Sequence, residues 1–119
     1  MATNFKQNGD SLTITAGATT VSGQVVAVGN QIGIAVNDIA SGAVGLVGMV
    51  GVYNVPKVSG AVIVAGESVI WDVTAAAFDD NLATPAIGDI SSACTAWESA
   101  GSGVTTIAVK LNTGVGTVA

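Results

Sequence analysis

The stretch Val25–Val36, which reads VVAVGNQIGIAV, decides the fold class of this chain. It holds two runs rich in Val and Ile, at Val25–Val28 and Gln31–Val36, separated by Gly29-Asn30. A two-residue link of this kind supplies the positive φ angles that a tight turn between antiparallel strands requires. Val and Ile also favour the pleated, half-buried surface of a sheet. The stretch therefore predicts a β-hairpin.

Short runs on both sides of the hairpin predict further strands. Residues Ser11–Thr15 (SLTIT) alternate, with Leu12 and Ile14 on one face. The downstream runs of strand character are Ala61–Val64, Ser68–Val73 and Val104–Leu111. Turn signals follow at intervals of about 8–12 residues, and no window requires a long helix. The pattern predicts an all-β protein, a small β-sandwich or β-barrel of about eight short strands.

Two windows are harder to interpret. The run from Gly42 to Val55 carries a glycine at every third position as far as residue 51. That period can mark a helix-packing face, but Gly costs about 1 kcal/mol per helical position relative to Ala. We therefore expect one strand here, straight or bulged, packed closely against another backbone. Residues 86–97 fit either a strand or one amphipathic turn, and Asp79-Asp80-Asn81 is expected to be a turn.

The domain organisation follows from the same pattern. At 119 residues the chain is expected to form one domain. Residues 1–10 (MATNFKQNGD) are polar apart from Phe5, and they predict an extended N-terminal arm. Residues 11–112 are expected to form a single β domain, and the small residues at 113–119 a flexible C-terminal tail.

The composition argues against most functional classes. The chain has no His and no Arg, and its three Lys are Lys6, Lys57 and Lys110. Histidine is the commonest general base and metal ligand, so we expect no catalytic residue, no metal site and no cofactor. A net charge of −5 disfavours nucleic acid and anionic membranes as partners. Only 9% of residues are charged, against about 25% in typical proteins, which favours a surface covered by protein partners.

The remaining candidates for chemistry are weak. No lysine follows glycine, as a phosphate-binding loop would require. Asp72 could pair with Glu67 or with Asp79 as acid and base, but nothing in the spacing selects either pair. Cys94 is a single cysteine and is expected to be a small buried hydrophobic residue. The first ten residues do not resemble a signal peptide, so we expect assembly in a cytoplasm.

Aromatic residues are few, and three interpretations of them stay open. Tyr53, Trp71, Phe78 and Trp97 could pack in the core, form a subunit interface, or form a binding platform. Tyr and Trp are enriched in protein interfaces. For this reason Tyr53, Trp71 and Trp97 are candidates for a subunit interface.

The order of several short motifs resembles a family of small phage proteins, the capsid decoration or cement proteins. The opening MATNFKQNGDSLTITA is similar to the opening of that family. The further matching segments, in order, are Ser22–Gly29, Gly33–Gly42, Gly51–Lys57, Gly66–Asp72 and Thr106–Asn112. The main departure lies between Asp79 and Gly103, where Cys94–Ala100 is less typical. Some members carry a label linking them to a RecA-like recombinase, which the missing phosphate loop and Arg contradict.

The resemblance implies a structural virion protein rather than an enzyme. It implies a capsid decoration protein that binds the outer surface of a phage head, as a trimer, and stabilises the shell. The partners would be the major capsid protein and further copies of this chain. The protein would be assembled in the cytoplasm of the host bacterium and be located in the virion.

The resemblance also suggests how the head is bound. An extended arm can add a strand to a sheet of the capsid. The capsid-contact candidates are Asn4, Phe5, Lys6 and Gln7, with Phe5 as an apolar anchor and Lys6 as a charged contact. The alternative for this segment is a disordered N-terminus. The alternatives for the whole chain are a head-fibre base, a host-carbohydrate binder or a tail component.

Overall fold

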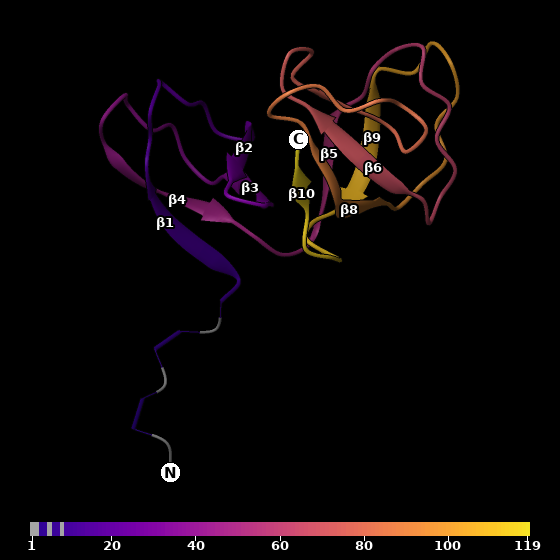
Figure 1. The fold of residues 1–119 in the computed structure, drawn as a ribbon. Coiled ribbons are helices and arrows are strands. Elements are labelled where there is room, and N and C mark those ends of the chain that lie inside the picture. The colour runs from indigo at the N-terminus through magenta and orange to yellow at the C-terminus, as the bar shows by residue number, and fades with distance from the viewer. Residues whose placement is uncertain (1–2, 5, 8) are drawn as a thin grey trace.

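The computed structural model describes residues 3–4, 6–7 and 9–119. Ten strands form two antiparallel sheets that share one core, and the described residues contain no helix (Figure 1). Within those residues, no helix is therefore long and apolar enough to cross a bilayer. The predicted all-β class is confirmed.

The N-terminal sheet is formed by the first four strands, in the order β1-β4-β3-β2. Their bounds are Ser11–Thr15 (β1), Val25–Val28 (β2), Gln31–Ala35 (β3) and Val44–Gly48 (β4). The predicted hairpin is confirmed, because β2 pairs with β3 across a link of Gly29 and Asn30. Gly29 has a φ of 59°, and Asn30 is not among the residues with positive φ. A single positive φ at the first turn residue is the geometry that places Gly there.

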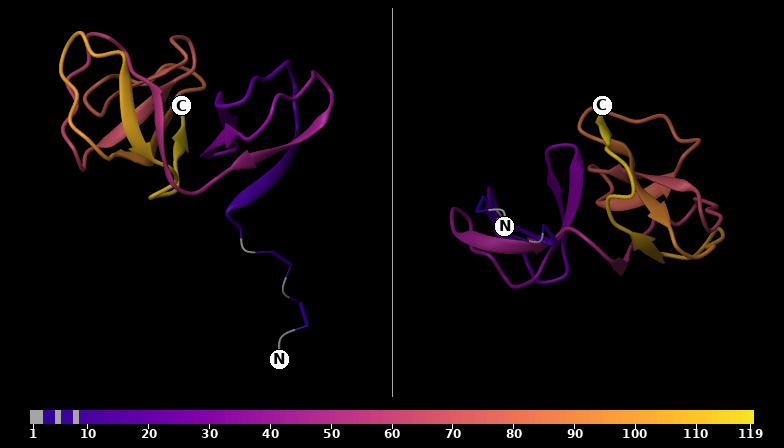
Figure 2. Two further views of the ribbon diagram at one scale, coloured as in Figure 1. Left: turned by 180° about the vertical axis from the view of Figure 1, so that it is seen from behind. Right: turned by 90° about the horizontal axis from the view of Figure 1, so that it is seen from below.

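The C-terminal sheet is formed by the remaining strands, in the order β5-β9-β8-β6-β7, with β10 paired to β8. Their bounds are Val52–Pro56 (β5), Ser68–Asp72 (β6), Ala77–Asp80 (β7), Ile90–Ala96 (β8), Thr106–Lys110 (β9) and Thr117–Val118 (β10). The two sheets lie side by side, and the arm leaves the body at the start of β1 (Figure 2). The described strands therefore form two sheets rather than one closed barrel.

The glycine-rich run is not one strand, as we had expected. It contains the end of one sheet and the start of the other, because β4 ends at Gly48 and β5 begins at Val52. The chain turns between them at Gly51, whose φ of 121° disfavours any residue with a side chain. The expected close packing is present, but against side chains: a Cβ at Gly45 would collide with Ile39.

Three other segments differ in detail from their predicted structure. Residues 61–64 make only an isolated bridge, between Ile63 and Ala100. Asp79 and Asp80 belong to strand β7 rather than to a turn. The ambiguous window 86–97 contains strand β8, because its residues pair with both β6 and β9.

The last seven residues, for which we expected a flexible tail, have a defined position in the structure. β10 pairs with β8, and the amide of Gly116 donates to the carbonyl of Asn30 at 3.2 Å. A Cβ at Gly116 would collide with that same carbonyl. The small residues that suggested a frayed end therefore allow the backbone to approach the rest of the protein closely.

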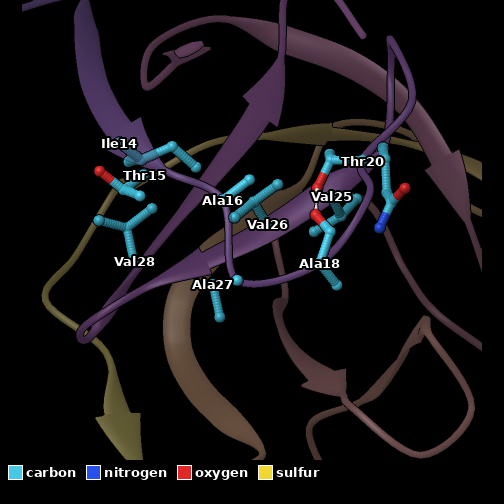
Figure 3. A pocket seen from close by; sticks show the side chains of 11 residues that line it. Ile14, Thr15, Ala16, Ala18, Thr20, Val25, Val26, Ala27 and Val28 are labelled. Carbon is cyan, nitrogen blue, oxygen red and sulfur yellow. Dashed lines mark hydrogen bonds between the residues drawn. The ribbon is translucent and has the colours of Figure 1, made fainter. Parts of the chain in front are cut away.

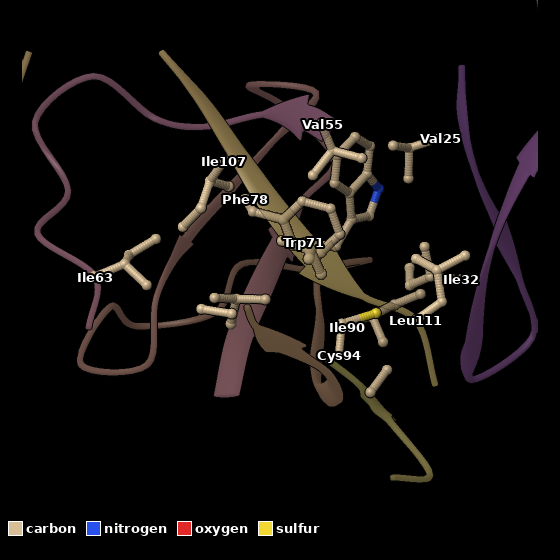
Figure 4. Close-up of a cluster of buried hydrophobic side chains, with 14 of the residues drawn as sticks. Val25, Ile32, Val55, Ile63, Trp71, Phe78, Ile90, Cys94, Ile107 and Leu111 are labelled. Carbon is tan, nitrogen blue, oxygen red and sulfur yellow. The ribbon is translucent and has the colours of Figure 1, made fainter. Parts of the chain in front are cut away.

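The main hydrophobic core lies largely within the C-terminal sheet and extends to one face of the N-terminal sheet. Strands β2 and β3 contribute Val25, Ile32 and Ile34, and the C-terminal sheet contributes most of the rest (Figure 4). Trp71 and Phe78 pack at its centre with ring centroids 5.0 Å apart. A smaller cluster of Ala16, Ala35 and Ile39 covers the other face of the N-terminal sheet. Burial of apolar surface at about 25 cal/mol per Å² is what holds the two sheets together.

The hydrogen-bond ladder between β3 and β4 covers only the last residues of β3, Ile34 and Ala35. Val36 donates its amide to Leu46, so every second residue of β3 bonds toward β4. Ile34 lies opposite Gly48 in this series. The next position, Ile32, has no β4 residue opposite it, because the chain leaves for the other sheet after Gly48.

The carboxamide of Asn112 occupies the vacant ladder position. Its Oδ1 accepts a hydrogen bond from the Ile32 amide at 2.9 Å, and its Nδ2 donates to the Ile32 carbonyl at 2.8 Å. Nδ2 also donates to the carbonyl of Met49 at 2.8 Å. One side chain from the turn that follows β9 thus completes the edge of the N-terminal sheet and fixes where the sheets meet.

Candidate interaction surfaces

The candidate arm residues lie at the surface, away from the rest of the body. Asn4, Lys6 and Gln7 are exposed, and Phe5 lies outside the described residues. Gln7 donates from Nε2 to the carbonyl of Ser11 at 3.1 Å. The side chains of Asn4 and Lys6 are therefore exposed ahead of β1, and that of Gln7 is exposed but hydrogen-bonded to the start of β1.

The three aromatic candidates have different positions. Trp71 is only 6% exposed and belongs to the core of the chain itself, so it is not available to a partner in this structure. Tyr53 is partly buried against the same core. Trp97 is 53% exposed. The structure therefore does not bring the two tryptophans together into one platform, and Trp97 is the candidate that reaches the surface.

Trp97 lies on the outer face of the C-terminal sheet. Its amide donates to the carbonyl of Ala108, and Nζ of Lys110 lies 4.8 Å from the centre of its ring. The pairing of β5 with β9 places Val52 beside Lys110 on the same face. This Trp97 face combines an exposed aromatic ring with small and apolar side chains, a composition typical of protein interfaces.

The N-terminal sheet offers a different kind of surface at its edges. In the order β1-β4-β3-β2, the described strands β1 and β2 are each paired on one side only. The Ala35 amide donates to the Gln24 carbonyl, so by alternation Val25 and Ala27 direct their peptide groups away from β3. Backbone groups at such an edge can pair with a strand from another chain.

A groove of about 400 Å³ lies between the end of β1 and the open edge of β2 (Figure 3). Its lining comes from the end of β1, the loop that follows it, and the whole of β2. Ile14, Ala16 and Val26 contribute apolar side chains to the lining, and Thr15, Thr20 and Gln24 contribute polar ones. The residues suit an extended peptide better than a charged small molecule, because the lining contains no ionisable side chain.

The acidic residues have local structural roles. Asp72 Oδ1 accepts the amides of Thr74 and Ala75, each at 3.0 Å. Asp79 Oδ1 accepts the amide of Asp80 at 2.8 Å. Over residues 3–4, 6–7 and 9–119, no three His, Cys, Asp or Glu side chains are grouped so that they could hold a metal ion.

Two buried polar residues were not identified from the sequence as structural. Lys57 is 3% exposed and donates from Nζ to three carbonyls, those of Val58, Gly101 and Val104. Asp89 is 4% exposed and accepts the amides of Val73 and Ala86. The sequence places Lys57 directly after Pro56, at the end of a strand. Only the fold shows that the lysine side chain turns inward.

Cys94 is buried in the core, as expected. Burial raises the pKa of its thiol from 9.0 to about 11, and a backbone hydrogen bond at Asn112 partly opposes this rise. Since the folded pKa is raised, the contribution to stability is complete below about pH 9 and is lost as the pH rises through about 11.

Cys94 is therefore expected to resist thiol reagents in the native protein. A disulfide reagent such as Ellman's reagent at about pH 8 should leave the folded chain unmodified, because only the exposed thiolate reacts. The denatured chain should release one equivalent, since it contains a single cysteine. Fast reaction of the native protein would contradict the buried position.

The comparisons with known proteins place this chain. A search of curated protein sequences finds no significant match. A family model described as phage cement protein matches residues 6–111, which covers both sheets as far as Leu111. That family is a family of structural proteins associated with phage capsids, not a family of enzymes. Since the match spans most of the sequence, the chain belongs to the phage cement protein family.

Proposed function

We propose that this protein binds the outer surface of a phage head as a trimer and stabilises the shell. The observation that carries the proposal is membership of the cement protein family, which associates the chain with a capsid. The low charge and the exposed Trp97 face support it, because they suit a surface that protein partners cover. The major capsid protein is the partner in this proposal.

The trimer would be held in part by the Trp97 face. An exposed Trp with small neighbours, supported by a cation–π contact from Lys110, can be buried against a second copy. Light scattering after size-exclusion chromatography measures the oligomer directly. A monomer at concentrations well above those used for head binding would contradict the trimer.

The arm would anchor the trimer to the head. Asn4, Lys6 and Gln7 are exposed ahead of β1, so an extended segment can reach a sheet edge of the capsid protein without rearrangement of the body. Three arms on one trimer bind together, and each further arm binds at a high effective concentration. Modest contacts per arm then give durable attachment, and the attached trimers resist rupture of the shell by packaged DNA.

Deleting residues 2–8 is expected to leave the fold intact and to abolish binding to expanded heads. The deletion removes the arm but keeps Ser11, where β1 begins. Binding is measured by co-sedimentation with heads that lack the protein, and folding by the thermal unfolding temperature.

A matched control separates the arm's sequence from its length. In this control, residues 2–8 are replaced by seven Gly and Ser residues, and it should also fail to bind. If the truncated protein decorates heads as well as the intact chain does, the arm is not the anchor. Thermal rupture of heads with and without the intact protein tests the stabilising role.

A further inference from the structure

The loop that joins β7 to β8 carries the two most exposed large hydrophobic side chains of the described residues. Leu82 is 91% exposed and Ile87 is 93% exposed. Both belong to the segment NLATPAIGD, at residues 81–89. Neither side chain is covered by the rest of the chain, although burying a Leu or Ile is among the most favourable packing events available to a protein. We call residues 81–89 the anchor loop.

Both ends of the anchor loop are held by aspartate side chains. Asp80 Oδ1 accepts the amide of Leu82 at 2.8 Å. At the other end, Asp89 Oδ2 accepts the amide of Ala86 at 2.9 Å. Asp89 is itself buried and also holds the amide of Val73. The backbone beside each exposed side chain is thus bonded to a fixed part of the fold.

Two further features restrict the loop. Pro85 lies between the two apolar side chains and fixes its own φ. The amide of Gly88 donates to the carbonyl of Ala119 at 2.9 Å, which ties the loop to the C-terminal end of the chain. A loop restrained in this way loses little conformational entropy when it binds. The two side chains are therefore presented in a conformation that is ready for contact.

The charge around the loop indicates the kind of partner. Asp79 and Asp80 precede the loop in β7 and Asp72 lies on the neighbouring strand, so its surroundings are acidic. A second copy of the chain is poorly suited to this surface. It has no Arg, the Nζ of Lys57 is buried and occupied by three carbonyls, and the Nζ of Lys110 lies over the Trp97 ring, so the exposed Lys6 of the arm is the one lysine left to complement it.

We propose that Leu82 and Ile87 dock as paired apolar anchors into a pocket, bordered by Lys or Arg side chains, on the protein shell of the phage head. This inference rests on the proposed function and adds to it a second contact that is independent of the arm. The apolar pocket supplies the affinity, and the basic border complements Asp79 and Asp80 and sets the orientation.

The first test removes the two anchors from the intact chain. The double variant Leu82→Ser, Ile87→Ser is compared with the control double variant Val62→Ser, Val115→Ser, which alters two other exposed residues. Co-sedimentation with undecorated expanded heads should give about 100-fold weaker binding for the anchor variant, because two buried side chains are lost. The control should bind within about threefold of the unaltered protein, and neither variant should change the unfolding temperature appreciably.

The outcomes separate this inference from the function on which it rests. If the unaltered protein binds heads and the anchor variant binds equally well, the inference fails and the proposed function stands. If the unaltered protein does not bind heads, both fail.

A second measurement identifies the occupant. A photo-crosslinking amino acid at position 82 should form an adduct with the shell protein of the head when the decorated particle is irradiated. An adduct only with a second copy of this chain would overturn the assignment of the partner.

The charge complementarity has its own measurement. Binding of the unaltered protein should weaken as salt increases. Asp79→Asn keeps the oxygen that accepts the Asp80 amide, and it should reduce that salt dependence. An unchanged salt dependence would contradict the basic border.

Discussion

Replacing Asn112 with alanine is expected to lower the free energy of unfolding by about 4 kcal/mol. The side chain makes three hydrogen bonds that no other described residue replaces, two to Ile32 and one to Met49. Each bond contributes about 1 kcal/mol, and the backbone groups left without a partner at this part-buried site cost more. The φ of Asn112 is 54°, a conformation that costs Ala about 1–2 kcal/mol but that Asn tolerates.

Urea unfolding measures this loss at one fixed protein concentration, since assembly would also affect stability. Asn112→Gly provides the informative comparison, because it loses the same hydrogen bonds but accepts the positive φ without strain. Its loss should be smaller than that of the alanine variant by about 1 kcal/mol. Asn54→Ala, at an exposed position of β5, is the control and should change stability by less than about 0.5 kcal/mol. Equal stability of the Asn112→Ala and Asn54→Ala variants would contradict the ladder role of Asn112.

Replacing Lys57 with methionine is expected to lower the free energy of unfolding by about 3 kcal/mol. Methionine is similar in length and apolar, so it preserves most of the packing but none of the donors. All three N–H groups of the Lys57 ammonium are used, at 2.9, 3.1 and 3.1 Å. Two of the acceptors, Gly101 and Val104, lie in the loop between β8 and β9, so the lysine fastens that loop to the end of β5.

The thermal unfolding temperature of Lys57→Met should fall by roughly 10–15 °C for a chain of this size. Lys6→Met in the exposed arm is the matched control and should leave the temperature unchanged within experimental error. A Lys57→Met variant as stable as the intact protein would mean that the three carbonyls find water instead. The two results together would show that polar residues at the ends of the described strands hold this small core in place.

Some of the fold could be predicted from local sequence because local physics decides it. The hairpin at Val25–Ala35 is an example, since the two β-branched runs and the Gly-Asn link all favour the same structure. Strand β1 is another, because SLTIT alternates strictly. The glycine-rich run could not be predicted in this way. Its composition is uniform, and whether a strand continues or changes sheets at Gly51 depends on pairing partners far away in the chain.

The same distinction between local sequence and distant contacts applies to the interaction surfaces. The family motifs that include Pro56-Lys57 and the closing Leu111-Asn112 could be read from the sequence, but their structural roles could not. The sequence does not distinguish the two tryptophans, yet Trp71 packs against Phe78 and Trp97 reaches the surface. The difference arises from where each lies in the sheet, since Trp97 follows the end of β8 and faces outward beside Ala108. The exposure of Leu82 and Ile87 could not be predicted, because it depends on whether distant parts of the fold cover the loop.

The sequence by itself determined the all-β class, the hairpin, the absence of His and Arg, and the resemblance to cement proteins. These depend on residue type, on alternation over a few positions and on the order of motifs, all of which are local or one-dimensional. The tertiary structure alone decided which polar residues turn inward, which tryptophan is exposed and how the two sheets are joined. The vacancy beside Ile32 exists only because β4 ends early, and Asn112 can fill it only because the fold brings a residue 80 positions further along the chain back to that place.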